Sequence, residues 1–255
     1  MELTVSGRQI ARRGGAAILG LLVLGASREA FAAPQASSPA YPQMAPAAEY
    51  LSPDRAAEIS LARSAAPPAI SASATVLVLS SEGYQIAVTG TNGFTCLVER
   101  AWMSPFDSPD FWNPKLRGPV CYNPAATRSI LPIARYRTRL AQSGVSKPHM
   151  FDEIRAAIAR KELPAPEPGA MSFMMSKDGY LGDAAAGPWH SHLMFYIPGK
   201  DPSSWGANLP GSPVVVDDQH LKTPEQQVIF LVPVSHWSDG SLAPEAGHAA
   251  QDGGK

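Results

Sequence analysis

The sequence predicts an α+β fold: a single domain with a largely antiparallel sheet, about three packed helices and long irregular loops. Three observations support this prediction. Short β-type runs come early in the chain, helical patterns follow, and further β-type runs come last, so strands and helices are segregated instead of alternating. Proline (25 residues) and glycine (21 residues) are abundant, which disfavours a helical bundle. The 255 residues are 45% hydrophobic, enough to bury a core.

Residues 1–32 are predicted to form a cleaved signal peptide. Three arginines between residues 8 and 13 give a positive start, and residues 30–32 (Ala-Phe-Ala) provide a cleavage site. The apolar run at 14–26 is shorter than the roughly 20 residues that a membrane-spanning helix needs. We therefore expect a periplasmic or secreted protein with no integral membrane segment after cleavage. The pair Arg12-Arg13 leaves both the general secretory and the twin-arginine route open.

The two cysteines, Cys96 and Cys121, agree with export. An even number of cysteines in an oxidising compartment favours a disulfide, and two separate buried thiols are the alternative. We predict a Cys96–Cys121 bridge that ties the third strand to the end of a long loop.

Residues 33–49 are rich in Ala, Pro, Ser and Gln and lack periodicity, which predicts a flexible leader. The domain is expected to span residues 50–240, and residues 241–255 are expected to be a disordered tail.

The first helix is predicted over residues 52–64. Ser52 is suited to the N-cap, Pro53 to the first helical position and Asp54 to the positive helix end. The pair at 67–68, Pro-Pro, stops the helix.

Three β-type runs follow, at residues 75–79, 84–89 and 94–102. The turns between them are short, and the second contains Asn92-Gly93, a pair that suits a tight hairpin. These features predict an antiparallel meander. Period-two alternation in the third strand places one set of side chains on each face: Phe94, Cys96 and Val98 on one, Thr95, Leu97 and Glu99 on the other.

Residues 104–124 are dense in Pro, Asp, Trp and Asn and are predicted to be a long irregular loop. A second helical region should start at the cap Asn123, be interrupted at Pro132 and end before Gly144. Its arginines are spread around the helix axis and are therefore expected to be solvated: Arg135, Arg137 and Arg139. A third helix is expected from residue 146 or 147 to residue 161.

The second half of the chain is β-like, with runs at 170–176, 187–198, 214–216 and 228–235. The first run carries Met171, Met174 and Met175. Their thioethers suit a soft metal such as copper, although methionine more often fills an irregular core.

The candidate site lies on the strand at 187–198. Alternation places Ser191, Leu193, Phe195 and Ile197 on one face, expected to enter the core, and His190, His192, Met194 and Tyr196 on the other. We predict that His190, His192 and Tyr196 form a ligand site under the loops that hold Trp112 and Trp205.

Several segments of the mature domain resemble a group of exported bacterial proteins. They are residues 92–100 (Asn-Gly-Phe-Thr-Cys-Leu-Val-Glu-Arg), 112–119 (Trp-Asn-Pro-Lys-Leu-Arg-Gly-Pro), 174–177 (Met-Met-Ser-Lys), 192–196 (His-Leu-Met-Phe-Tyr) and 237–240 (Trp-Ser-Asp-Gly). The resemblance implies a shared fold and export. The group carries no known activity, so no catalytic residue can be transferred.

The sequence supports three hypotheses for function. The first is a non-catalytic binding domain for a small molecule or a cell-envelope component, because no complete catalytic signature is present. The second is an enzyme with a divalent metal ion as cofactor, bound by His190 and His192 and by a third ligand from a short list of candidates: His220, His236, Asp183, Asp217 or Asp239. The third, a serine hydrolase, lacks Gly-x-Ser-x-Gly and Ser-x-x-Lys. Nucleic acid is not an expected partner, since the net charge is −1 and only 17% of residues are charged.

Overall fold

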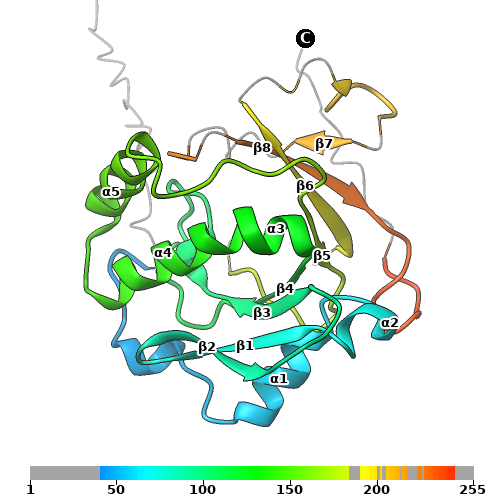
Figure 1. Ribbon diagram of the computed structural model, residues 1–255, viewed down its shortest axis with the longest axis horizontal. Coiled ribbons are helices and arrows are strands. Elements are labelled where there is room, and N and C mark those ends of the chain that lie inside the picture. Colours follow the sequence, from blue (N-terminus) through cyan, green and yellow to red (C-terminus); the bar gives the residue numbers. More distant parts are fainter. Residues whose placement is uncertain are drawn as a thin grey trace, which may run out of the picture. The chain divides into compact units, whose positions relative to one another are not determined.

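The computed structural model describes residues 41–183, 190–199, 202, 205–212, 214–216, 223–225 and 227–244 (Figure 1). All of them belong to one compact unit, Ser38–Lys255. They form a mixed α+β fold, which confirms the predicted fold class. Within these residues, no helix is both long and apolar enough to cross a bilayer. The predicted signal peptide, residues 33–40 of the predicted leader and most of the predicted tail lie outside the described residues. The remaining leader residues, 41–49, do not form a free segment, because Tyr41, Met44 and Ala45 pack against the core.

The described part of the chain builds one eight-stranded sheet in the order β2-β1-β3-β4-β5-β6-β8-β7 (Figure 1). Its strands are β1 (Thr75–Ser80), β2 (Gly83–Val88), β3 (Thr95–Glu99), β4 (Gly118–Tyr122), β5 (Met171–Met174), β6 (His192–Pro198), β7 (Val215–Val216) and β8 (Gln227–Pro233). Neighbouring strands are antiparallel except β1 and β3, which run parallel.

Helices cover both faces of this sheet (Figure 1). α1 (Arg55–Arg63) packs against β1, β3 and β4, and the short α2 (Pro68–Ser71) follows it. α3 (Pro124–Ser129), α4 (Leu131–Gln142) and α5 (Lys147–Ala159) contribute to the core on the opposite face. Two 3₁₀ turns, η1 (Ala47–Tyr50) and η2 (Ala101–Met103), flank the strands.

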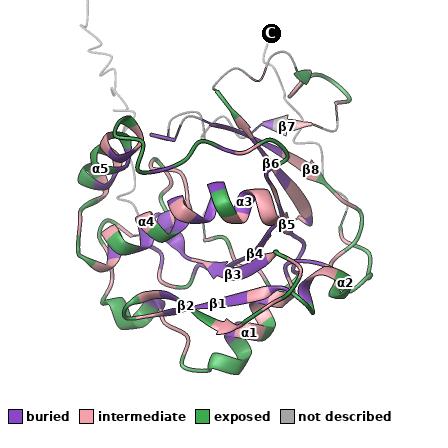
Figure 2. Ribbon diagram, viewed as in Figure 1, coloured by how far each residue is buried: buried purple, intermediate pink, exposed green. Residues whose placement is uncertain are grey.

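Each face of the sheet buries its own core, because successive strand residues point to opposite faces. On the α1 side, Val76, Cys96 and Val98 pack against small residues of and after α1, among them Ala62 and Ala65. The α3–α5 side is larger and contains Leu77, Leu97, Val120, Trp102, Phe111 and Trp112. Figure 2 shows the central strands β1, β3 and β4 as mostly buried.

Cys96 and Cys121 form the predicted disulfide. They lie directly opposite each other in the β3–β4 pair, with 4.0 Å between their Cα atoms, and both are fully buried. A buried disulfide is typical of an oxidising, extracytoplasmic environment.

The predicted helices at α3, α4 and α5 are confirmed, and Asn123 caps α3 by accepting a hydrogen bond from the Ala126 backbone N–H at 2.9 Å. The first helix has a different cap from the predicted Ser52. Asp54 Oδ1 accepts from the backbone N–H groups of Ala56 and Ala57 at 2.8 and 3.1 Å. A carboxylate can accept both bonds and also carries the charge that the helix N-terminus favours.

The predicted meander is wrong in its last step. β3 does not form a hairpin with β2 but crosses to the far side of β1 and pairs with it in parallel, Val76 opposite Cys96. The connection passes close to the start of β1 at Gly90, where an added Cβ would lie 2.1 Å from the Thr75 backbone nitrogen. Asn92 does not serve a tight hairpin; its side-chain N–H donates to the Ile70 carbonyl at 2.8 Å.

The predicted loop at 104–124 is also partly wrong, because it contains the central strand β4. Pro119 argues against such a strand, since proline cannot donate to a ladder. The backbones of Arg117 and Tyr180 exchange hydrogen bonds on the β5 side of β4, so alternation directs the Pro119 nitrogen to that side too. β5 pairs with Cys121 and Tyr122 and does not extend to Pro119, so no ladder bond is lost there.

The two faces of β6 also differ from the prediction. Met194 and Tyr196 enter the larger core, and they are 9% and 3% exposed. Phe195 and Ile197 instead pack on a smaller cluster on the other side of the sheet with Val228 and its neighbours. The physical reason is that both faces of this strand are covered, so alternation alone does not reveal which face meets the main core.

Candidate functional site

The candidate site is a cavity of about 550 Å³ on the α4 side of the sheet. Its floor is built from alternate residues of β3, β4, β5, β6 and β8. The chemically distinctive side chains on this floor are Glu99, Tyr122, Met174, His192, Met194 and Tyr196. Period-two alternation explains why residues from five strands reach one surface.

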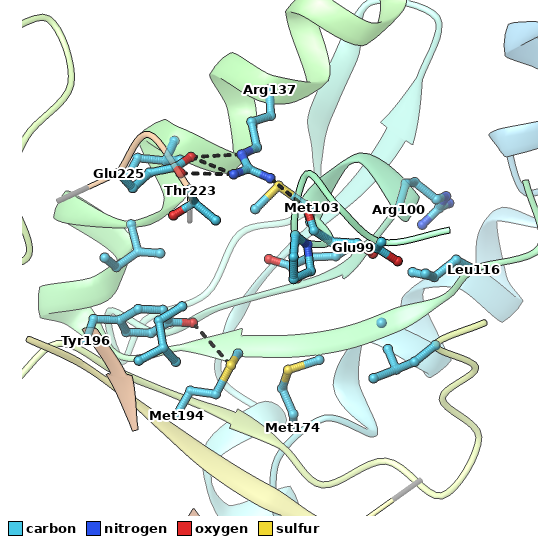
Figure 3. A pocket seen from close by; sticks show the side chains of 18 of the residues that line it. Glu99, Arg100, Met103, Leu116, Arg137, Met174, Met194, Tyr196, Thr223 and Glu225 are labelled. Carbon is cyan, nitrogen blue, oxygen red and sulfur yellow. Dashed lines mark hydrogen bonds and ion pairs between the residues drawn. The ribbon is translucent and has the colours of Figure 1, made fainter. Parts of the chain in front are cut away.

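The roof of the cavity comes from four segments that are distant in sequence. Met103 belongs to η2, Leu116 to the loop before β4, and Ile133 and Arg137 to α4, while residues 223–225 approach from the C-terminal half. Figure 3 shows Met174 and Met194 on one side of the cavity and Met103 on the other. The wall therefore combines aliphatic, thioether and phenol groups with polar and charged side chains.

Arg137 and Glu225 form a buried ion pair in this roof (Figure 3). Arg137 Nε and Nη2 donate to the two carboxylate oxygens at 2.9 and 3.0 Å. Its Nη1 donates to the backbone carbonyls of Trp102 and Ser104 at 3.0 and 3.1 Å. The guanidinium is thus neutralised and holds α4, η2 and residues 223–225 together. Our expectation that Arg137 is solvated is wrong, whereas Arg135 and Arg139 are exposed as expected.

Arg100, which also lines the cavity, is held in the same way. Its Nη2 donates to Glu58 Oε1 at 2.7 Å, and its other nitrogens donate to the carbonyls of Tyr50 and Val98. Arg100 is fully buried and Glu58 is 3% exposed. Both cations at the cavity wall are therefore paired with a glutamate.

Two phenols on the floor are neutral hydrogen-bonding groups. Tyr122 donates a short hydrogen bond to Glu99, and burial together with the charge of that carboxylate raises the pKa of Tyr122 well above its ordinary value. Tyr196 lies 2.9 Å from the Ser172 hydroxyl, and burial raises the pKa of Tyr196 as well. Both side chains retain their protons at neutral pH.

His192 is held in one tautomer. Its Nδ1 lies 2.8 Å from the His190 carbonyl oxygen, which can only accept, so Nδ1 carries the hydrogen. Burial lowers the pKa of His192, which favours the neutral ring. Nε2 therefore bears the lone pair.

The structure brings together only some of the residues that we predicted for the site. His192 and Tyr196 line the cavity, whereas His190 does not. Trp112 is buried in the core beside Phe111. Trp205 is 53% exposed and packs on Phe230, which belongs to the cluster on the opposite face of the sheet.

The candidates for a third metal ligand are dispersed. Asp183 accepts from Tyr41 and Tyr180, Asp239 accepts from Lys177, and His236 bonds to Ser235. His220 and Asp217 lie outside the described residues. Within the residues that the structure describes, no three His, Cys, Asp or Glu side chains are grouped closely enough to hold a metal ion.

Sequence reasoning missed most residues of the cavity, among them Glu99, Met103, Arg137 and Glu225. Alternation in β3 had assigned Glu99 to the correct face, but no local signal marked that face as a cavity wall. The partnership of Arg137 with Glu225 spans 88 residues and has no counterpart in any local pattern.

Comparison of the chain with protein-family models, with curated proteins and with solved structures finds no match. Function must therefore be inferred from the chemistry of the cavity.

Proposed function

We propose that the protein is an exported, non-catalytic binding protein that holds a small molecule in the cavity between the sheet and α4. The observation that carries the proposal is the cavity itself. Its volume of about 550 Å³ falls within the range of small-molecule sites, roughly 300–1,000 Å³. Most of its lining surface is apolar, and polar side chains interrupt that surface, as in small-molecule sites.

The walls also support a particular class of ligand. Methionine side chains adapt to irregular shapes, and aliphatic residues of α4 and β8 extend the apolar surface. Glu99 adds a carboxylate that accepts hydrogen bonds at the β3 end. Because Arg100 and Arg137 are each paired with a glutamate, neither favours an anion. We expect a neutral or cationic molecule with an apolar body and a hydrogen-bond-donating group.

The site is held in shape before a ligand arrives. Two buried ion pairs and the backbone carbonyls that they engage connect the roof segments, and the floor is a paired sheet. Preorganisation lowers the cost of binding. The signal-peptide pattern and the buried disulfide support a periplasmic or secreted location, where a cell-envelope component is a further ligand of this class.

A metal-dependent enzyme that uses His190 and His192 is less well supported. His192 reaches the cavity and His190 does not, so the two imidazoles do not share this site.

Binding can be tested by filling the cavity at Gly118. A Cβ built on Gly118 would lie 3.6 Å from atoms of Glu99, Leu181 and Met174, all of which line the cavity. Gly118→Leu should therefore occupy the cavity, whereas Gly118→Ala adds one methyl at ordinary contact distance. The neutral probe Nile red should bind the wild-type protein saturably, and Gly118→Leu should weaken it by about tenfold or more, or about 1.4 kcal/mol. Equal binding to folded Gly118→Leu and wild type would refute the proposal.

A further inference from the structure

We infer that the cavity floor also binds a soft monovalent cation, Cu(I) or its redox-inert analogue Ag(I), through the thioethers of Met174 and Met194 and Nε2 of His192. Thioether ligands select Cu(I), and imidazole also suits copper. This metal site is additional to the small-molecule function proposed above, and the evidence for it does not depend on that function.

The strand register brings the three side chains together. Met174 lies directly opposite His192 in the β5–β6 pair, and Met194 is two residues further along β6 on the same face. Directly opposite residues have Cβ atoms about 4.5–5.5 Å apart, and diagonal neighbours are about 7–8 Å apart. Two residues along a strand are separated by about 6.6 Å. The Cβ atoms of the three residues therefore form a small triangle on the sheet. From these positions the two thioethers and the imidazole can bind the same ion.

The thioethers border open volume. Both side chains line the cavity, and Figure 3 shows their sulfur atoms turned toward it. Methionine is unbranched and has three rotatable bonds, so both sulfurs can turn toward a common point. The Tyr196 hydroxyl contacts Met194 Sδ at 4.0 Å. Tyr196 is not one of the three proposed ligands, and this contact helps to position the Met194 side chain.

The imidazole is oriented as a ligand. A metal-binding histidine usually donates its other ring N–H to a carboxylate, a backbone carbonyl or water, and this bond sets the tautomer and the ring direction. His192 makes this bond from Nδ1 to the His190 carbonyl, which assigns the lone pair to Nε2. Two thioethers and one imidazole are a donor set that favours a soft ion over zinc.

The test is an anaerobic titration of the full exported protein with Ag(I), followed by NMR of ¹³C-labelled methionine methyl groups. We expect one tightly bound Ag(I) per chain. Of the 8 methionines in the sequence, Met174 and Met194 should show large methyl shifts, while Met171 should not. Met171 is on the same strand, but it pairs with Phe195 and faces the other side of the sheet.

Two matched variants separate ligation from packing. The double variant Met174→Leu/Met194→Leu conserves volume and should remain folded, because such substitutions usually cost less than about 1.5 kcal/mol each. It should lose more than about 100-fold in Ag(I) affinity, since even outer-shell partners of a metal are each worth about 10–100-fold. Met171→Leu should bind like wild type. Unchanged affinity in the double variant, or binding that shifts only other methionines, would overturn the inference. Gly118→Leu tests Nile red binding separately, so failure of either proposal can be told from failure of the other.

Discussion

On the α1 side of the sheet, small side chains bring the helix close to the strands, whereas on the α4 side large side chains and a buried ion pair leave space above them. Ala62, Ala65 and Ala66 are at most 1% exposed and pack directly on Val76, Val98 and the disulfide. The α4 side contains Trp102, Trp112 and the Arg137–Glu225 pair, together with the cavity. The comparison shows that one sheet can be rigidly supported on one face while its other face forms a binding site.

The largest expected effect comes from breaking the link between α1 and the end of β3. Glu58→Ala leaves Arg100 buried without its carboxylate, and removing one partner of a buried pair typically costs about 3–5 kcal/mol. Urea unfolding should show this loss of stability. Glu58→Gln keeps a hydrogen-bond acceptor and should lower the free energy of unfolding by less than Glu58→Ala. If both variants lose the same stability, the hydrogen-bond acceptor that Glu58→Gln keeps does not stabilise the fold.

Removal of the disulfide should have a slightly smaller effect. The bridged residues are 25 apart, and closing a loop of this size stabilises a fold by about 3–4 kcal/mol on the chain-entropy model. Cys96→Ala/Cys121→Ala should lower the free energy of unfolding by this amount. Reduction of the wild type with dithiothreitol is the control, and it should produce the same change. If the variant is as stable as the oxidised wild type, the disulfide does not stabilise the core on the α1 side.

A direct test of the comparison adds the same side chain to each face. Ala62→Leu introduces bulk where α1 meets the sheet and should cost about 1–3 kcal/mol, the usual range for overpacking. Gly118→Leu adds its side chain to the cavity and should cost less than Ala62→Leu, because space is present there. Thermal unfolding of both variants gives the comparison, and the reverse order would contradict it.

The substitution Asp183→Asn, at an exposed residue outside both covered faces of the sheet, should have the smallest effect on stability. The hydrogen bond to Asp183 raises the pKa of the half-buried Tyr41 to about 12, and hydrogen bonds from Tyr180 and Tyr41 lower the pKa of Asp183. The stabilisation from Tyr41 is therefore complete below the ordinary tyrosine pKa of about 10 and is lost as pH rises through about 12. In Asp183→Asn, ultraviolet titration should show the Tyr41 pKa falling toward about 10. An unchanged titration curve would show that Asp183 does not control Tyr41.

Local reasoning predicted one strand of the candidate site, β6, but not the other residues that line the cavity. Alternation in β6 correctly grouped His192, Met194 and Tyr196 on one face. It also grouped His190 with them, although that residue precedes the strand and does not line the cavity. Trp112 and Trp205 were assigned to the site because they lie in irregular loops, yet one is buried in the core and the other lies exposed against the opposite cluster.

What the sequence alone determined is the set of features that depend on neighbours along the chain. The fold class, the strands at β1, β2, β5, β6 and β8, the helices α3–α5 and the Asn123 cap follow from periodicity, proline positions and capping chemistry, which act over a few residues. The cysteine count and the export pattern similarly predicted the disulfide. Tertiary structure alone decided the parallel β1–β3 pair, the central place of β4 and the burial of Arg137 against Glu225. It also placed Met174 opposite His192. These features depend on strand register and on contacts between distant segments. Such contacts stabilise the fold only once the sheet and its covering helices have packed together.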